Sequence, residues 1–235
     1  MESNHIRFHG FARSTTRSRA MAKVHKDSKR QKLTQIAREI AQCDQCRFDS
    51  IGKPAPGDGL PDARLVFVGE APGRNEAAVG HAFVGRSRKL LRQSIRFLGP
   101  KRKIFFTNAL KYLPKSGAPK RAAIQHGRVH LLQQLQALGP SLVVLLGKTA
   151  ARAVFGREIP VLKKHGSFCC KVGDPTRYFI TVHPSAAMRF PAMRRVFLGD
   201  LELLAKGLHR NTVRTAAKLS AGGGVHGEKK SGGPS

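Results

Sequence analysis

The sequence predicts a three-layer α/β/α sandwich around a mostly parallel central sheet. Short apolar runs typical of buried strands alternate with longer segments in which apolar residues recur at helical spacing. Three of these runs end in polar or glycine-rich loops. Strands of a parallel sheet are apolar on both faces because helices cover both sides, so this alternation favours an α/β domain over an all-α or all-β one.

The predicted elements follow one another from residue 33 onwards. The helix at 33–42 has apolar residues at helical spacing and leads into the cysteine pair Cys43 and Cys46. The later elements are a strand at 65–69, a helix at 87–98, a strand at 103–110, a helix at 124–138, a strand at 141–146, a helix at 148–155, a strand at 177–182 and a helix at 194–208. Glycine directly follows several of the helices, as expected of a residue that ends helices without strain.

The two ends of the chain differ in composition from this middle part. Residues 1–31 are basic and poor in apolar residues, which predicts a disordered basic arm. The same stretch is compatible with an organellar transit peptide, or with a natural start at Met21. Residues 207–235 are rich in Gly, Ser and Lys and are expected to form a flexible tail. The folded domain is therefore expected at 32–206.

Charge is the strongest compositional signal. The 235 residues contain 43 Lys and Arg against 14 Asp and Glu, a net charge of +29. Such an excess favours a polyanionic partner, nucleic acid above all. No apolar run reaches the roughly 18 residues of a membrane span, and four cysteines do not make a disulfide framework. We therefore expect a monomer in a reducing compartment, the bacterial cytoplasm near the nucleoid, with no membrane partner.

Polar loops follow three of the predicted strands: GEAPG at 69–73, TNALK at 107–111 and HPSAA at 183–187. In a parallel sheet, ligands bind in the crevice beyond the carboxyl ends of the strands. These three loops are therefore expected to converge on one site.

The loops carry a resemblance to a known family. The segments GEAPGRNEAAVGHAFVGRSRKLL, FFTNALKYLP, LVVLLGKTAARAVFG and HPSAAMR resemble, in order and spacing, the motifs of the uracil-DNA glycosylase superfamily. The match spans about residues 33–204 and is nearest to the family-four branch, whose members carry an iron–sulfur cluster. It implies a monofunctional glycosylase of base-excision repair that flips deoxyuridine out of single- or double-stranded DNA and hydrolyses its N-glycosidic bond. Uracil is released, and the abasic site passes to downstream processing enzymes.

The resemblance assigns roles in uracil recognition and bond cleavage. Phe83 corresponds to the aromatic residue that stacks on the base. The Asn108 carboxamide can accept from uracil N3–H and donate to O4, whereas cytosine would leave a buried polar group unpaired at a cost of about 1–3 kcal/mol. His183 would donate to O2 of the departing base and stabilise its negative charge.

The first motif departs from the superfamily's better-known members. In those relatives an Asp orients the attacking water, and Ala71 stands at its position here. Glu70 or a backbone carbonyl would then orient the water. The turn that contains Gly69 and Ala71 offers backbone N–H groups near the base. Glu76 matches an acid that lines the C5 side of the base and excludes the methyl group of thymine, although its usual Asp neighbour is Ala77 here.

Basic and apolar residues around these loops are expected to hold DNA. The HPSAAMRFPAMRR segment would enter the minor groove, with Met188 or Phe190 wedged into the base stack. The residues expected to contact DNA are Lys111, Lys115, Lys120, Arg121, Ser185, Met188, Arg189, Phe190, Arg194 and Arg195. Phosphate contacts of this kind predict binding that weakens steeply with salt.

Two of the four cluster cysteines of the family are missing. Cys43 and Cys46 match the first two ligands, but Tyr112 and Gly127 stand at the other two positions. The resemblance therefore implies a protein without metal or other cofactor. In this reading Cys43 and Cys46 are a remnant pair in an apolar pocket, and Tyr112 packs into the vacated space.

One alternative keeps a metal centre. Cys169 and Cys170 are poor substitutes for the missing ligands, because neighbouring residues on a strand point to opposite faces. His126 or His130 would then be the ligands that rescue a cluster or a zinc site.

Two other functions remain as alternatives to a glycosylase that excises uracil. The first is a binder that grips uracil-containing or abasic DNA without turnover, covalently if His126 acts as a nucleophile. The second is a basic architectural protein that binds DNA without regard to uracil.

Overall fold

The computed structural model describes residues 12–82, 84–99 and 102–221. Its centre is a six-stranded sheet in the order β2, β4, β3, β6, β8, β7. The strands span Asp58–Gly59 (β2), Leu65–Gly69 (β3), Ile104–Asn108 (β4), Leu142–Leu146 (β6), Ser167–Cys170 (β7) and Arg177–Thr181 (β8). The four inner strands are parallel, and the two edge strands pair antiparallel to their neighbours. The mostly parallel sheet is as predicted.

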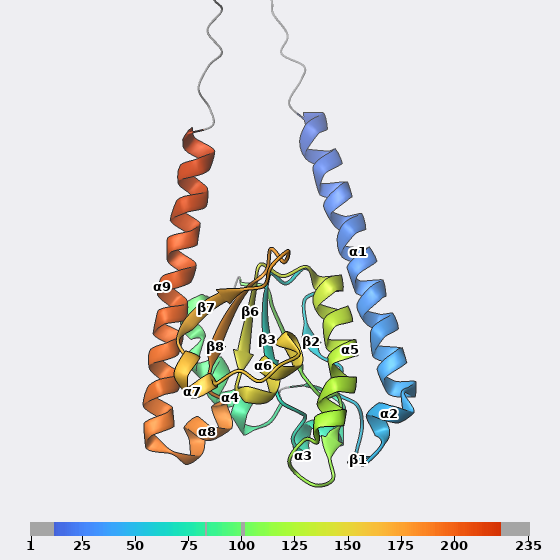
Figure 1. Ribbon diagram of the computed structural model, residues 1–235. Coiled ribbons are helices and arrows are strands. Elements are labelled where there is room, and N and C mark those ends of the chain that lie inside the picture. The colour runs from blue at the N-terminus through green and yellow to red at the C-terminus, as the bar shows by residue number, and fades with distance from the viewer. Residues whose placement is uncertain (1–11, 83, 100–101, 222–235) are drawn as a thin grey trace, which may run out of the picture.

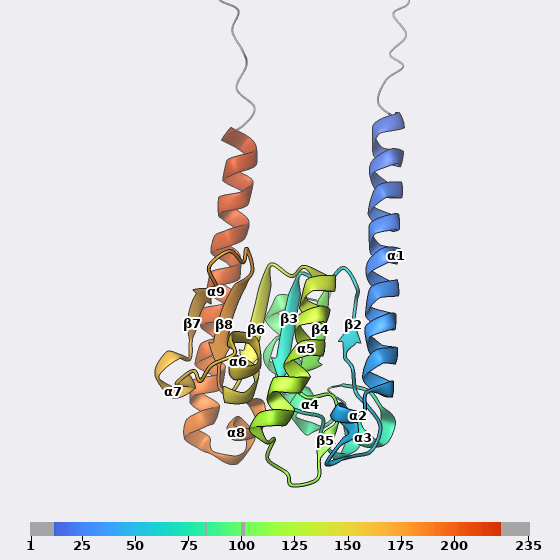
Figure 2. The same ribbon diagram turned by 45° about the vertical axis from the view of Figure 1, so that its right-hand side comes forward.

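Helices cover both faces of the sheet, which gives the predicted three layers (Figures 1 and 2). Helices α5 (Arg121–Leu138) and α6 (Lys148–Phe155) lie over one face, while α4 (Arg86–Ser94) and α9 (Pro191–Ala221) lie over the other. Residues of β3 and β6 are buried throughout, because both of their faces contact helices.

Shorter elements complete the fold. These are α2 (Asp44–Arg47), α3 (Arg74–Val79), the 3-10 helix Arg96–Leu98, α7 (Val161–Lys164) and α8 (Pro184–Arg189), with a separate two-stranded sheet of β1 (Ser50–Ile51) and β5 (Leu113–Pro114). None of the helices in the described part of the chain is long and apolar enough to cross a membrane.

The long helices at the two ends correct the expected domain boundaries. Helix α1 spans Ala12–Gln42, so residues 12–31 of the expected disordered arm are helical. Helix α9 continues to Ala221, so residues 207–221 of the expected flexible tail are helical too. Both stretches lack apolar periodicity, but Ala, Lys and Arg are good helix formers and can extend a helix that packing has already nucleated. Residues 1–11 and 222–235 of the arm and the tail lie outside the described part.

The two ends project away from the carboxyl edge of the sheet. In Figure 1 the first turns of α1 and the last turns of α9 rise above the sheet, whereas α3 and α8 lie below it. The loops that lead into α3 and α8 follow β3 and β8, so they mark the carboxyl ends of the parallel strands. The site loops and the outer ends of the basic helices therefore lie at opposite edges.

Candidate functional site

The loops after β3 and β4 are joined by backbone hydrogen bonds. The N–H of Ala109 donates to the carbonyl of Gly69 at 3.0 Å, and the N–H of Leu110 donates to the carbonyl of Glu70 at 2.9 Å. Gly69 and Asn108 are also register partners at the ends of the two parallel strands. The GEAPG and TNALK loops therefore lie side by side at the carboxyl edge of the sheet.

Asn108 is the last residue of β4 and is 3% exposed. Its carboxamide makes no hydrogen bond with other residues in the part of the chain that the structure describes. A buried carboxamide without a protein partner can pair with a ligand, since it presents both a donor and an acceptor.

A buried lysine supports the backbone at Asn108. The Lys111 ammonium donates to the Asn108 carbonyl at 2.7 Å, to Thr107 Oγ1 at 2.8 Å and to Gln134 Oε1 at 2.7 Å. Burial lowers the pKa of Lys111 to about 7. The expectation that Lys111 contacts DNA is wrong, because its side chain is 1% exposed and its donors are used inside the protein.

His183 precedes α8 and caps its first turn. Its Nδ1 accepts the backbone N–H of Ser185 at 3.1 Å and lies 2.7 Å from Ser185 Oγ. A ring nitrogen that accepts from an amide carries no proton, so the proton of the neutral ring is on Nε2. Burial lowers the pKa of His183, and Arg189 lowers it further, while Glu70 opposes them. His183 is therefore neutral at pH 7, with Nε2–H as its available donor.

The turn between β6 and α6 holds Glu70 and His183 in place. Thr149 Oγ1 donates to Glu70 Oε2 at 2.5 Å. Gly147 has a φ of 88°, and a Cβ there would lie 3.1 Å from the Cβ of His183, so glycine permits this close approach. This role of Thr149 was not predicted; the available signal was a polar Thr shortly after the buried strand β6.

Glu76 connects two segments of the first motif. Its carboxylate accepts the backbone N–H of Gly73 at 3.1 Å and that of Gly85 at 2.7 Å. These bonds fix the carboxylate against the backbone on either side of Phe83, which itself lies outside the described residues. Ala71 lies in the same loop and is partly buried.

The remaining residues expected at DNA lie on the surface or close to it. Met188 and Phe190 are 40% and 58% exposed at the end of α8. Lys120 forms an ion pair with Asp49 at 2.6 Å. The other exposed basic residues of the expected set are Lys115, Arg121, Arg189, Arg194 and Arg195. Ser185 is partly buried and its hydroxyl faces His183, so it is placed to position that ring.

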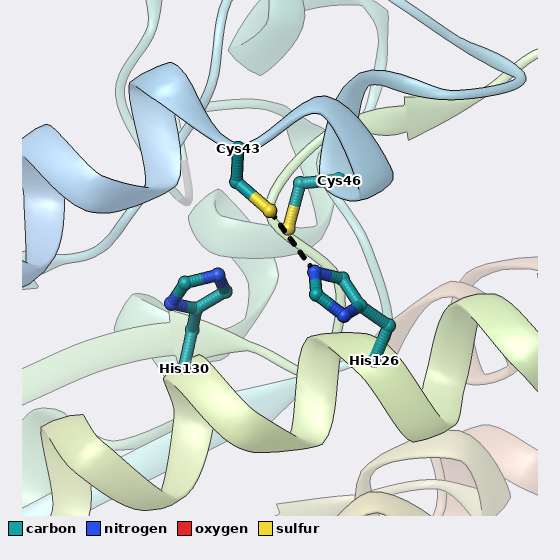
Figure 3. Close-up of side chains that lie close together, drawn as sticks. All are labelled: Cys43, Cys46, His126 and His130. Carbon is teal, nitrogen blue, oxygen red and sulfur yellow. Dashed lines mark hydrogen bonds between the residues drawn. The ribbon is translucent and has the colours of Figure 1, made fainter.

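A second cluster of polar side chains lies between the end of α1 and α5. Cys43 and Cys46 come from the α1–α2 junction, and His126 and His130 come from α5 (Figure 3). One ligand atom from each of the four lies within 4.8 Å of the others, and Cys43 Sγ is 3.0 Å from His126 Nε2. This is a set of donors that could hold a metal ion.

Cys46 is partly buried and Tyr112 is buried in this region. Burial and, to a smaller extent, the adjacent Cys43 raise the pKa of the Cys46 thiol to about 12, while Lys111 opposes them. Tyr112 is buried beside the cysteines against Ile36 and Ile40, as expected, and its hydroxyl lies 3.4 Å from the carbonyl of Ala41. A cavity of about 340 Å³ borders Cys46 and His126 on the side of α2.

Comparisons with known proteins agree with the motifs. A family model described as "Uracil DNA glycosylase superfamily" matches residues 56–202. A Type-4 uracil-DNA glycosylase from Pyrobaculum aerophilum is 33% identical over 186 residues, 75% of this chain and 93% of that protein. The Type-4 enzymes from Archaeoglobus fulgidus and Thermotoga maritima are 31% and 32% identical, each over 74% of this chain and over 92% and 93% of their own lengths.

The expectation of a protein without metal is wrong. Several relatives are Type-4 enzymes, the branch for which the resemblance implies an iron–sulfur cluster. Cys43 and Cys46 are not a remnant pair, because His126 and His130 complete a four-residue group that could hold a metal ion. The alternative with a metal centre named His126 or His130 as ligands, and both lie in this group. His126 lies 83 residues after Cys43 and is brought to it by the packing of α1 on α5.

Proposed function

The chain belongs to the uracil-DNA glycosylase superfamily and is a glycosylase of its type-4 branch, and we propose that it flips deoxyuridine out of DNA and hydrolyses the N-glycosidic bond. The site at the carboxyl edge of the sheet would receive the extruded base. Free uracil and an abasic site would be the products, and enzymes that process abasic DNA would act next. The base must leave the duplex because the glycosidic bond is out of reach inside the stack.

Recognition of uracil rests on Asn108 in this proposal. Its buried carboxamide would accept from N3–H and donate to O4, the reverse of the pattern that cytosine offers. The support is that Lys111 fixes the backbone carbonyl of Asn108, so that the carboxamide extends from a rigid strand end. A cytosine in this pocket would leave polar groups unpaired, at about 1–3 kcal/mol each.

Bond cleavage would depend on His183 as a neutral donor. Negative charge develops on O2 of the departing base, and a fixed N–H aimed at that oxygen stabilises the anion without reorganisation. The hydrogen bond from the Ser185 N–H to Nδ1 leaves Nε2–H as the donor. The single observation that carries the proposal is this tautomer, held at the carboxyl edge of the sheet beside Glu70.

Glu70 would act on the sugar side of the bond. Thr149 holds one of its carboxylate oxygens, and the other makes no hydrogen bond with the described residues. A carboxylate in this position would stabilise the positive charge on the sugar and orient the attacking water. The Asp that performs this task in other members of the superfamily is Ala71 here.

DNA would approach the lower edge of the molecule as drawn in Figure 1. The exposed side chains of Met188 and Phe190 would wedge into the stack as the base leaves it, and Arg189 and Arg194 would contact phosphates. Glu76, fixed between Gly73 and Gly85, would limit the space near C5 of the base.

Incubation with a labelled oligonucleotide that carries one uracil tests the proposal. After incubation with the protein, the strand should break only when alkali is added, since hydrolysis of the glycosidic bond leaves an intact backbone with an abasic site. Oligonucleotides with thymine or cytosine at the same position should remain intact. A protein–DNA product that survives denaturing gels and disappears in His126→Ala would instead support covalent trapping, although His126 Nε2 lies 3.0 Å from Cys43 Sγ.

A further inference from the structure

The ligand cluster between α1 and α5 has the sequence spacing and the donor types of a zinc site. Cys43 and Cys46 form a C-x2-C pair, and His126 and His130 form an H-x3-H pair. Structural zinc sites combine these two spacings in C-x2–4-C and H-x3–5-H pairs. The histidines lie one turn apart on the same face of α5, so both rings reach the cysteines (Figure 3).

We propose that Cys43, Cys46, His126 and His130 bind one Zn²⁺ ion in a tetrahedral site that fastens the end of α1 to α5. The four ligand atoms lie within 4.8 Å of one another. Zinc bonds of about 2.3 Å to sulfur and about 2.0 Å to nitrogen imply ligand separations of roughly 3.3–3.8 Å around a tetrahedron. Binding of the ion would therefore draw the most widely separated ligand atoms together by about 1 Å.

The tautomer of His130 supports a metal-facing nitrogen. Its Nδ1 lies 3.2 Å from Gln133 Oε1, an oxygen that can only accept, so Nδ1 carries the proton. The other nitrogen, Nε2, is buried and has no hydrogen-bond partner among the described residues. Metal-ligating histidines commonly donate their second ring N–H to an oxygen in this way. A metal ion would satisfy the otherwise unpartnered Nε2.

The four side chains are arranged for a single metal ion. They fit less well the iron–sulfur cluster with four cysteine ligands that the family resemblance implies. In a four-iron cluster each protein ligand binds a different iron, and bridging sulfides separate the irons, so its ligands stand farther apart than the ligands of one ion. The donor set also differs, since two of the four donors are imidazoles.

Neither Tyr112 nor Gly127, the two positions of the missing cysteines, leaves room for a cysteine ligand. At Gly127 a Cβ would lie 2.4 Å from the carbonyl oxygen of Ala109, so a cysteine does not fit there without a shift of α5. At the other position the Tyr112 ring is 6% exposed and packs against Ile36 and Ile40. The residues that replaced the cluster ligands bring α5, α1 and the loop after β4 together around the Cys and His side chains.

The ion would add to the packing that already holds α1 and α2 against α5. Helix α2 is four residues long, and it contacts α5 and β1. Tyr112 and Lys111, which support the loop after Asn108, lie directly beside the ligand group. Zinc would therefore link the N-terminal helix to the loop of the site, with a structural role in place of a direct role in the reaction.

Metal analysis of the purified full chain is the direct test. Cells should be grown with both iron and zinc in the medium, and the protein purified without a histidine tag under reducing conditions. The expected result is close to one zinc per chain, with no stoichiometric iron or acid-labile sulfide. Replacement by Co²⁺ should produce the thiolate-to-cobalt and intense d–d absorption bands of a tetrahedral site.

Ligand and control variants locate the ion. His130→Ala and Cys43→Ser should each lower the zinc content at least severalfold, whereas Cys169→Ser, which removes a cysteine from β7, should keep it at the wild-type level. Chelation of the wild-type protein should lower its melting temperature, and re-addition of Zn²⁺ should restore it. None of these measurements depends on glycosylase activity, so they stand apart from the proposed function.

Three results would overturn the proposal. Stoichiometric iron with labile sulfide would mean an iron–sulfur cluster held by mixed ligands. A protein with neither metal nor cobalt uptake would mean that the four side chains form only a polar contact. Zinc that persists in both ligand variants would place the ion elsewhere.

Discussion

His183 and Ser185 are joined by a hydrogen bond from the backbone N–H of Ser185 to Nδ1 of His183, with a nitrogen–nitrogen distance of 3.1 Å. This bond selects the neutral tautomer with the proton on Nε2. It requires a ring that is not doubly protonated, because a protonated Nδ1 cannot accept. The proposed function therefore depends on a neutral histidine.

The pH dependence of excision should reflect this requirement. The pKa of His183 is lowered from its ordinary value of 6.5, so the ring stays neutral as the pH falls through 6.5 and gains its second proton only below that value. Single-turnover excision rates measured from about pH 5 to about pH 8.5 should show no loss centred at 6.5 from this group. A fall with a midpoint at or above 6.5 that is absent in His183→Gln would contradict the account.

Thr149→Val should reduce the rate of excision through Glu70. The substitution keeps the shape of the side chain but removes the hydroxyl that donates to Glu70 Oε2 at 2.5 Å. A hydrogen bond to a charged group contributes about 1.5–3 kcal/mol, which corresponds to roughly a 10- to 100-fold slower reaction if the carboxylate loses its position. Single-turnover rates at saturating enzyme measure the effect. An unchanged rate with an unchanged melting temperature would mean that Glu70 has no part in the reaction.

Two lysines of the same loop should behave differently. Lys111→Met should lower the free energy of unfolding by about 1–3 kcal/mol, because three internal acceptors lose their donor. Lys115→Met, at an exposed position, should leave stability unchanged and weaken DNA binding with a smaller salt dependence. Urea unfolding measures the stability of the two variants, and DNA binding at several salt concentrations measures their contribution to phosphate contacts. Equal effects of both substitutions on stability would argue against the buried role of Lys111.

Gly127 and Gly199 offer a matched pair of helix glycines. Gly127→Ala should destabilise the fold by about 1–3 kcal/mol, because its Cβ would lie 2.4 Å from the carbonyl oxygen of Ala109. Gly199→Ala places a Cβ on α9 with nothing within 4 Å and should be neutral, or stabilising by about 0.5–1 kcal/mol. Thermal unfolding compares them. If Gly127→Ala were as stable as Gly199→Ala, α5 could move outward and the closed position at 127 would not exclude a cysteine.

Much of the fold could be predicted from local pattern. The apolar runs of β3, β4, β6 and β8 are buried on both sides, so their hydrophobicity alone identified them. The two-residue strands β1, β2 and β5 were not predicted, because such short pairings depend on tertiary contacts and leave no periodicity. The helical extent of α1 was missed because its outer turns have no apolar face to signal it.

Site residues could be predicted only where they lie at the end of a predicted strand or in the loop after it. Asn108 ends one strand and His183 closely follows another, so both could be assigned to the carboxyl edge from the sequence. The burial of Lys111 could not be predicted, because its partner Gln134 comes from α5 and a lysine after a strand usually faces solvent. The metal ligands lie on helices that are distant in the chain. The sequence offered His126 or His130 as alternatives, and the packing of the helices brings both of them to the cysteines.

The most direct test of the central claim is the single-turnover rate of uracil excision for the wild-type protein, Asn108→Ala and His183→Ala on one oligonucleotide. The account predicts alkali-dependent cleavage by the wild type, a loss of roughly 10- to 100-fold in Asn108→Ala from the unpaired base edge, and a loss of about 100- to 1,000-fold in His183→Ala from the missing donor at O2. Circular dichroism should show that both variants remain folded. Wild-type rates in both folded variants would contradict the assignment of the site.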